Sequence, residues 1–218
     1  DLTIAGPETV LTDGLADLFE ERGLPFFGPS KAAAEIEGSK IFAKKLMKKY
    51  KIPTADYAVF DDEGKAVSYV KKQKKYPLVI KADGLASGKG VIIAGTEEEA
   101  LTAVRDMMDG KAFGSAGKSL VIEEFMEGEE ASVLCFTDGE TIVPLISAQD
   151  HKRIGNGDTG LNTGGMGAYA PAPVMTDKLN KEVYDKILVP TIRAMKKEGR
   201  PFKGCLYAGL MITKEGPK

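Results

Sequence analysis

A glycine-rich loop between two short apolar segments constrains the fold of this chain more than any other feature. Residues 81–90 read Lys-Ala-Asp-Gly-Leu-Ala-Ser-Gly-Lys-Gly, and they lie between Leu78–Lys81 and Val91–Ala94. The flanking segments are short and rich in β-branched residues, which predicts strands. The loop should therefore join two strands of a sheet, instead of opening a helix after a strand.

The glycines of this loop indicate one of two uses. Without a Cβ atom they let backbone N–H groups approach anionic oxygens, and Lys81 and Lys89 supply positive charge. A P-loop does not fit, because only three residues separate Gly84 from Gly88 and because Gly90 stands where the Mg²⁺-binding hydroxyl should be. A flap that folds over phosphates and an ordinary flexible hairpin with exposed lysines both remain open.

Composition excludes several classes of protein. In 218 residues, 43% are hydrophobic and 28% are charged, which is typical of globular domains and argues against disorder. Thirty basic residues against 32 acidic ones argue against a nucleic-acid partner, and no apolar run reaches membrane-spanning length. Cys135 and Cys205 lie in strand patterns, so we expect reduced core residues and a cytoplasmic setting.

Both ends of the chain are expected to belong to larger structures. The pattern over residues 1–30 predicts a strand, a helix that ends at Gly23 and a second strand, a unit too small for its own core. We interpret it as the remnant of an N-terminal α/β domain. Residues Cys205–Thr213 alternate like a strand, and 214–218 read as a hairpin turn without a return strand. The chain is therefore expected to be a fragment.

A lysine-rich helix is predicted over residues 40–50, with Ser39 as its N-cap. Its apolar stripe lies opposite Lys44, Lys45, Lys48 and Lys49, which indicates a solvated face. Lys40 lies at the border of the stripe and could reach inward. Residues 31–90 carry 14 lysines against 7 acidic residues, whereas the rest of the chain has 16 basic and 25 acidic residues. Such a division suits a polyanion held with a metal, although the solvated helix face explains most of it.

The remaining elements follow from periodicity and capping signals. Thr96 and Thr176 are predicted N-caps, and Pro190 should bend the second of these helices. Residues 148–173 show no periodicity and are predicted to form a long, functional or disordered loop. Strands are predicted over 57–60, 120–125, 131–136 and 141–146, and helices over 63–74, 97–108 and 176–197.

Two further segments carry candidate chemistry. Val121–Glu130 is an apolar strand that runs into several carboxylates, which could bind ribose hydroxyls or a metal or could form a solvated surface turn. Gln149–Arg153 contains the single histidine of the chain, and Asn162–Gly167 offers a second set of glycine backbone donors. Two glycine-rich anion sites with Arg and Lys beside them suggest a reaction between negatively charged partners.

These motifs together resemble the glycinamide ribonucleotide synthetases (phosphoribosylamine–glycine ligases) of the ATP-grasp superfamily. The resemblance covers nearly all of the chain, and the stretches at 149–153 and 162–169 are the most specific to that family. The matching segments are Ala5–Glu8, Phe27–Ser30, Glu37–Lys40, Ile80–Val91, Glu123–Phe125, Ser147–Arg153, Asn162–Tyr169, Pro171–Pro173 and Leu206–Met211.

The resemblance implies an ATP-grasp fold of mixed α/β and α+β class, in which two α+β subdomains clamp a nucleotide. It implies a helical linker over 31–55, a small subdomain over 56–125 and a truncated large subdomain over 126–218. It also implies ATP-dependent joining of glycine to 5-phosphoribosylamine through glycyl phosphate, with Mg²⁺ or Mn²⁺, in a cytoplasmic monomer without nucleic-acid or membrane partners. Another ATP-grasp carboxylate–amine ligase, or a nucleotide-binding module without catalysis, is the alternative.

Site residues are carried over from the resemblance by position. Arg153 and Asn162 are implied as catalytic residues near the γ-phosphate. The implied ATP-binding residues are Lys40, Lys81, Gly84, Ser87, Gly88, Lys89, Gly90, Glu123, Glu124, Phe125, Met126 and Glu130. The implied substrate-binding residues are Asp150, His151, Lys152, Thr163, Gly164 and Gly165. Metal ligands are expected beyond Lys218, so the fragment alone is expected to be inactive.

Overall fold

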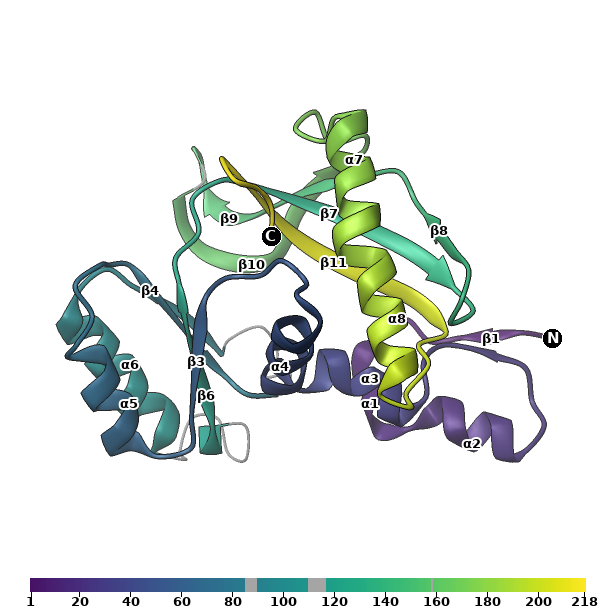
Figure 1. The fold of residues 1–218 in the computed structure, drawn as a ribbon, viewed down its shortest axis with the longest axis horizontal. Coiled ribbons are helices and arrows are strands. Elements are labelled where there is room, and N and C mark those ends of the chain that lie inside the picture. Colours follow the sequence, from purple (N-terminus) through teal and green to yellow (C-terminus); the bar gives the residue numbers. More distant parts are fainter. Residues whose placement is uncertain (85–89, 110–116, 158) are drawn as a thin grey trace. The chain divides into compact units, whose positions relative to one another are not determined.

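The computed structural model describes residues 1–84, 90–109, 117–157 and 159–218 (Figure 1). The chain divides into two compact units. The central unit comprises residues 35–48 and 54–126, and the terminal unit comprises residues 1–34, 49–53 and 127–218. None of the helices in the described residues is both long enough and apolar enough to cross a membrane.

The central unit is built on a four-stranded antiparallel sheet. Its strand order is β3-β6-β4-β5, and the bounds are β3 (Tyr57–Phe60), β4 (Leu78–Ala82), β5 (Val91–Ala94) and β6 (Leu120–Glu124). Strands β4 and β5 pair antiparallel, with Lys81 opposite Val91, which confirms that the glycine loop joins two neighbouring strands. Ser87, Gly88 and Lys89 of that loop lie outside the described residues.

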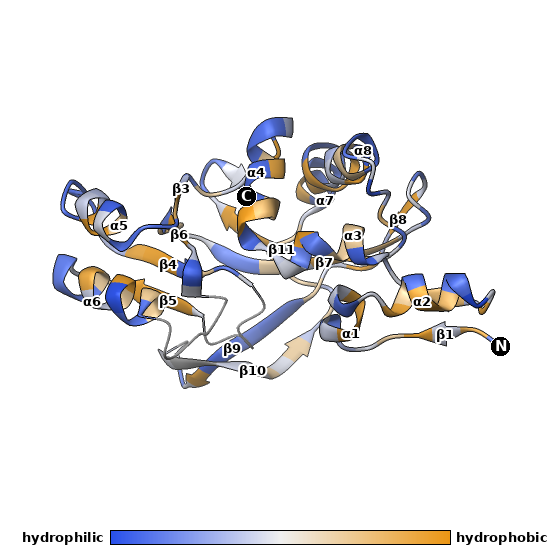
Figure 2. Cartoon of the chain, turned by 90° about the horizontal axis from the view of Figure 1, so that it is seen from below, coloured by the Kyte–Doolittle hydropathy of each residue, from blue (hydrophilic) through white to orange (hydrophobic). Residues whose placement is uncertain are grey.

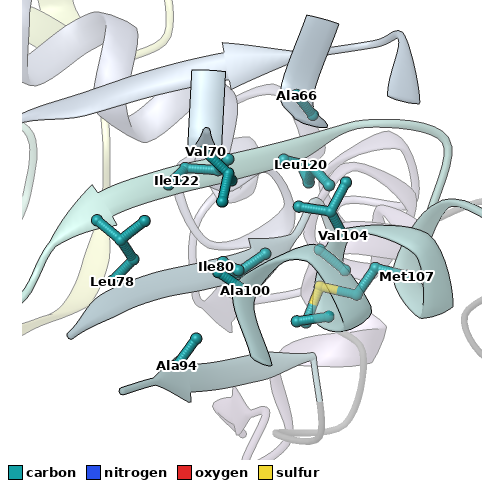
Figure 3. Packing of buried hydrophobic residues seen from close by; sticks show 12 residues of the cluster. Ala66, Val70, Leu78, Ile80, Ala94, Ala100, Val104, Met107, Leu120 and Ile122 are labelled. Carbon is teal, nitrogen blue, oxygen red and sulfur yellow. The ribbon is translucent and has the colours of Figure 1, made fainter. Parts of the chain in front are cut away.

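Two helices cover one face of this sheet, α5 (Glu63–Val70) and α6 (Glu97–Met108) (Figure 1). The N-cap predicted for α6 is confirmed, because the Thr96 hydroxyl accepts from the Glu99 N–H at 3.2 Å. Helix α5 ends four residues earlier than the predicted Lys74. Figure 3 shows the core between these helices and the sheet, to which α5 contributes Val70, α6 contributes Val104 and Met107, β4 contributes Ile80 and β6 contributes Leu120.

Strand alternation decides where the polar residues of the sheet point. Ile80 and Ile122 face the helices and are buried in the core, and each such side chain stabilises the fold by roughly 1.5–3 kcal/mol. Because successive side chains of a strand point to opposite faces, Lys81 and Glu123 lie on the other face of the sheet. Helix α4 (Lys40–Tyr50) covers that other face (Figure 1).

Helix α4 has the predicted bounds and the predicted cap. The Ser39 hydroxyl accepts a hydrogen bond from the Phe42 N–H at 3.0 Å. A second helix, α3 (Lys31–Gly38), precedes it. The prediction of a fully solvated lysine face is wrong for Lys44, which is only 8% exposed, whereas Lys45 is exposed.

The terminal unit contains a second four-stranded antiparallel sheet, of order β12-β11-β7-β8. Its strands are β7 (Glu129–Thr137), β8 (Ile142–Pro144), β11 (Gly204–Thr213) and β12 (Gly216–Pro217). The predicted turn after Thr213 therefore does have a short return strand, because β12 pairs with the end of β11. The expectation that both cysteines are buried is wrong for Cys205, which is exposed, while Cys135 is buried and both are free.

A long helical segment runs alongside this sheet (Figure 1). It consists of α7 (Asp177–Val183), a π-helical turn (Tyr184–Leu188) and α8 (Val189–Lys197). The Thr176 cap is confirmed by the bond from the Leu179 N–H at 3.3 Å. The distortion predicted at Pro190 takes the form of the π-helical turn immediately before it, since proline lacks the N–H that would continue the α-helical ladder.

The prediction of a structureless loop over residues 148–173 is wrong. This stretch forms an antiparallel hairpin of β9 (Gln149–Gly155) and β10 (Thr159–Tyr169), with register shifts along its length. Most of β9 is hydrophilic (Figure 2), so the segment lacks the alternation of a half-buried strand. Because this stretch has many glycines and an irregular register, its pairing could not be predicted from hydrophobic periodicity.

The N-terminal residues form a small parallel pair, β1 (Thr3–Ile4) with β2 (Phe26–Phe27). Two helices connect these strands, α1 (Glu8–Asp13) and α2 (Leu15–Glu21), where one was predicted. Gly14 separates them with a φ of +97°, a left-handed conformation that favours glycine.

Candidate functional site

Lys81 and Glu123 meet on the α4-facing side of the central sheet. In the β4–β6 ladder Lys81 pairs with Val121 and Glu123 pairs with Val79, which makes Lys81 and Glu123 diagonal neighbours on one face. The Lys81 ammonium lies 2.9 Å from Glu123 Oε2. Two residues predicted to bind a nucleotide are therefore joined by an ion pair within one sheet.

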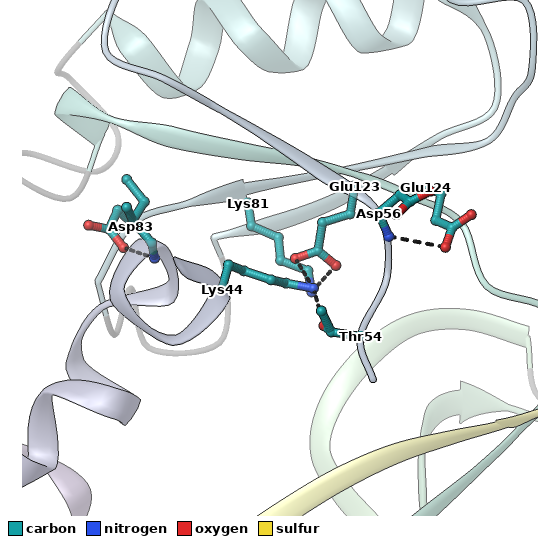
Figure 4. Close-up of polar contacts among 8 residues, drawn as sticks. Lys44, Thr54, Asp56, Lys81, Asp83, Glu123 and Glu124 are labelled. Atoms are coloured by element: carbon teal, nitrogen blue, oxygen red, sulfur yellow. Dashed lines mark hydrogen bonds and ion pairs between the residues drawn. The ribbon is translucent and has the colours of Figure 1, made fainter. Parts of the chain in front are cut away.

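Lys44 of helix α4 contacts the same carboxylate from the helix side of this face (Figure 4). Its ammonium lies 3.2 Å from Glu123 Oε1 and donates a hydrogen bond to the Thr54 hydroxyl at 2.7 Å. Glu123 is only 3% exposed, so both of its oxygens face buried or half-buried cations. We call this arrangement the Glu123 cluster; it consists of Lys44, Thr54, Lys81 and Glu123.

The beginning of the glycine loop is tied to the N-terminus of α4. The Asp83 carboxylate accepts from the Ser39 hydroxyl at 3.2 Å and from the Ile41 N–H at 3.1 Å. Lys40 donates to the carbonyl oxygen of Gly84 at 2.5 Å, so the prediction that Lys40 reaches inward is confirmed. A carboxylate at a helix N-terminus is also favoured by the helix dipole.

Several charged side chains gather in this region. The ammonium groups of Lys40, Lys44 and Lys81 lie here, and the carboxylates that act on Lys40 and Lys44 are those of Glu37, Asp83, Glu123 and Glu124. Burial lowers the pKa of Lys40, and the nearby Lys81 lowers it further. Burial also lowers the pKa of Lys44, against the opposing effect of Glu123. Partly desolvated ammonium groups with lowered pKa values are suited to an anionic ligand, which would stabilise their charged form.

Apolar and exposed side chains lie beside these charges. Val91 and Ile93 of β5 are 39% and 42% exposed. Val91 pairs with Lys81 across the β4–β5 ladder and therefore shares its face of the sheet. Phe125, which follows β6, is 38% exposed, and Met126 is half-buried. The carboxylate of Glu124 accepts from the Asp56 N–H at 3.1 Å and so holds the residue that precedes β3 (Figure 4).

The terminal unit holds a separate group of predicted site residues on β7 and β9. The Lys152 ammonium lies 3.1 Å from Glu130 Oε2 and 3.6 Å from Asp150 Oδ2. Burial alone would lower the pKa of Lys152, but the hydrogen bond to Glu130 and the two nearby carboxylates raise it. Lys152 is therefore a stable cation between two carboxylates.

The β9–β10 hairpin arranges the other residues of this group. Arg153 donates to the Gly160 carbonyl at 2.9 Å, and its backbone pairs with that of Asn162. The Thr163 hydroxyl donates to the Lys152 carbonyl and accepts from the Gly165 N–H at 3.0 Å. The His151 ring lies against Tyr169 with 5.5 Å between ring centroids.

The predicted site residues therefore fall into two groups. One group lies in the central unit around Lys81 and Glu123, and the other lies on the hairpin and β7 of the terminal unit. Lys44, Thr54, Ser39 and Asp83 were not among the predicted site residues. The spacing of Lys40 and Lys44, four residues apart, places both on one face of a helix and could have indicated Lys44. In the part of the chain that the structure describes, no three His, Cys, Asp or Glu side chains gather where they could hold a metal ion.

Comparison with known proteins decides the family. Residues 38–218 match the family model described as phosphoribosylglycinamide synthetase, ATP-grasp (A) domain, and residues 1–37 match the model of the N domain of the same synthetase. The chain belongs to the phosphoribosylglycinamide synthetase family. Its fold is accordingly the predicted ATP-grasp fold.

Relatives in this family are identical to the chain at more than half of the aligned positions. It is 55% identical over 216 residues to a phosphoribosylamine–glycine ligase of Vibrio vulnificus and 55% identical over 215 residues to that of Yersinia pestis. Each alignment covers 99% of this chain and 50% of the relative. The chain thus spans about half the length of these family members.

Solved structures agree with the family. A phosphoribosylamine–glycine ligase from Thermotoga maritima superposes with a TM-score of 0.84 at 37% identity, over 94% of this chain and 51% of that one. The biotin carboxylase domain of a Hydrogenobacter thermophilus 2-oxoglutarate carboxylase superposes with a TM-score of 0.74 at 22% identity, over 99% of this chain and 46% of that one. At that identity the second likeness concerns the fold alone.

Proposed function

We propose that this chain supplies the nucleotide-binding part of a phosphoribosylamine–glycine ligase. In this reaction the carboxylate oxygen of glycine attacks the γ-phosphorus of ATP, the bond to the β-phosphate oxygen breaks, and glycyl phosphate and ADP form. The amine of 5-phosphoribosylamine then attacks the glycyl carbonyl carbon, phosphate leaves and the amine loses a proton. The product is glycinamide ribonucleotide.

The observation that carries this proposal is the group of partly buried ammonium groups around Lys81, at the start of the glycine loop, within a family whose members are named as such ligases. Lys40 and Lys81 would donate to the nucleotide phosphates, and the loop from Gly84 to Gly90 would cover them. Removing water from such a site strengthens the attraction between ammonium groups and phosphate oxygens. The ammonium groups would thereby offset the repulsion between the glycine carboxylate and ATP.

Adenine would lie along the end of β6, with Glu123–Met126 presenting backbone and side-chain groups to it. The exposed apolar surfaces of Val91, Ile93 and Phe125 suit a planar aromatic base better than they suit water. Glu130 would accept from the ribose hydroxyls, although in the free protein its carboxylate is paired with Lys152.

The hairpin residues of the terminal unit would act on the substrate side. Arg153 and Asn162 would stabilise the transferred γ-phosphate. Asp150, His151 and Lys152, with Thr163, Gly164 and Gly165, would bind glycine or the phosphoribosyl group. The Thr163 hydroxyl already orders the Gly165 N–H, a backbone donor suited to an anion.

We further propose a divalent cation, Mg²⁺ or Mn²⁺, as the cofactor that accompanies ATP. The described residues do not form a metal site by themselves, so no step of the reaction is derived through this ion. A cytoplasmic, monomeric enzyme that acts on small molecules completes the proposal.

A coupled assay of ADP release tests the function. A protein that contains this chain together with the remaining half of its relatives' length should release ADP only when glycine and phosphoribosylamine are both present. Release that requires a different carboxylate or amine would indicate another ATP-grasp ligase. Nucleotide binding without release under any pair of substrates would indicate a binding module.

A further inference from the structure

Lys44 is a buried cation to which the proposed reaction assigns no part. Its side chain is 10% exposed, and its ammonium contacts Glu123 Oε1 and the Thr54 hydroxyl. It also lies 5.7 Å from the ring centroid of Tyr57. Placing an ammonium in such a site costs desolvation free energy, so its burial requires the carboxylate beside it.

Lys44 is less suited than Lys81 to touch a ligand. The Lys81 side chain is 26% exposed, more than twice the exposed fraction of Lys44, and both contact the same carboxylate. Lys44 faces Glu123 Oε1, whereas Lys81 takes Glu123 Oε2 (Figure 4). Lys81 is therefore the cation nearer to solvent, and Lys44 is the more deeply buried one.

The negative charge of Glu123 is shared between two ammonium groups, those of Lys44 and Lys81. Glu123 Oε1 is buried, and among the described residues the Lys44 ammonium, 3.2 Å away, is its charged partner. If Lys44 were neutral, Lys81 alone would have to balance the carboxylate. Lys81 would then be held more tightly by Glu123, and the site would lose one positive charge.

We propose that Lys44 is a positioning residue that acts through Glu123. It occupies one oxygen of Glu123 and thereby leaves the Lys81 ammonium free to bind a nucleotide phosphate. This inference rests on the proposed nucleotide site. It deepens that proposal by naming Lys44 as the residue that offsets part of the negative charge of Glu123, the partner of Lys81.

The test is a double-mutant cycle on the 218-residue chain, with affinity for adenylyl imidodiphosphate and Mg²⁺ measured by isothermal titration calorimetry. Lys44→Met should weaken binding roughly tenfold or more, because one buried charge of a pair is removed. Lys44→Arg should restore most of the affinity. Lys45→Met, on the exposed side of the same helix, is the matched control and should change affinity less than twofold.

The cycle separates action through Glu123 from a general loss of structure. In a Glu123→Gln background the carboxylate that Lys44 neutralises is gone, so adding Lys44→Met should cost less than threefold. Thermal unfolding of each variant reports whether it is folded. If Lys44→Met does not fold, Lys44→Gln takes its place, because an amide can still bond to Thr54.

Two results would overturn the inference. Either a folded Lys44→Met chain binds the analogue as tightly as the wild type, or the losses from Lys44→Met and Glu123→Gln multiply as independent effects. The failure of the proposed function gives a different pattern. In that case the wild-type chain itself does not bind the analogue, and the inference falls with the proposal on which it rests.

Discussion

Lys81 is the residue whose loss should cost nucleotide binding most. Its ammonium is the more exposed of the two that contact Glu123, so it is placed to exchange part of that contact for a phosphate. We expect Lys81→Ala to weaken ATP binding by about 10- to 100-fold, as hydrogen bonds to charged groups contribute about 1.5–3 kcal/mol. Calorimetry with Lys45→Ala as the control measures it. Equal affinity of the two variants would refute the role of Lys81.

Nucleotide affinity should also depend on pH in a characteristic way. Burial lowers the pKa of Lys40 and of Lys44 below the ordinary value of 10.5, and an ammonium attracts phosphate only while it is protonated. Affinity should therefore be full at neutral pH and should fall, as pH rises, before pH 10.5 is reached. A Lys40→Met variant should bind more weakly and show a shallower fall. An affinity that stays constant to pH 10.5 would contradict this prediction.

The two cysteines should differ in reactivity. Burial raises the pKa of Cys135 to about 11 and also raises that of Cys205, but the Cys205 residue is exposed whereas Cys135 is buried. A thiol reagent reacts with thiolate, so at pH 8 the folded chain should be labelled at Cys205 and protected at Cys135. Mass spectrometry after brief labelling checks this expectation. Rapid labelling of both cysteines in the absence of denaturant would show that β7 is not packed as described.

At the scale of elements, the contact between the glycine loop and α4 is the feature that organises the site. Asp83 adds a long-range cap to the local one, since its carboxylate accepts from Ser39 and Ile41 at the start of α4. The loop therefore starts from a fixed point. Ser39 serves both as the N-cap of α4 and as a donor to Asp83.

Asp83→Asn should loosen this attachment. The amide keeps one acceptor but loses the negative charge at the helix N-terminus, so we expect a loss of about 1 kcal/mol in the free energy of unfolding. ATP affinity should fall as well, because the Gly84 carbonyl that accepts from Lys40 would be held less firmly at the start of α4. Urea unfolding and calorimetry measure the two effects. An unchanged midpoint together with unchanged affinity would show that the contact has no role.

Elements that depend on local signals could be predicted from the sequence. The starts of α4, α6 and α7 follow from Ser39, Thr96 and Thr176, because a capping hydroxyl acts within three residues of its position. The β9–β10 hairpin could not be predicted, because its glycines and register shifts remove the period on which strand prediction depends. The burial of Lys44 could not be predicted either, because its partner Glu123 lies far away in the sequence.

At the scale of the whole chain, the site residues implied by family resemblance divide between two compact units. Each unit has its own antiparallel sheet and its own set of helices. The central unit carries the lysines and the glycine loop, and the terminal unit carries the hairpin with Arg153 and Lys152. We therefore propose that the groups that bind the phosphates and the base of the nucleotide lie within the central unit.

A crystal structure of the chain with adenylyl imidodiphosphate and Mg²⁺ tests that assignment most directly. We predict phosphate oxygens within hydrogen-bond distance of the ammonium groups of Lys40 and Lys81, with the base beside Phe125 at the end of β6. A nucleotide bound elsewhere, with both ammonium groups still directed only at Gly84 and Glu123, would contradict it.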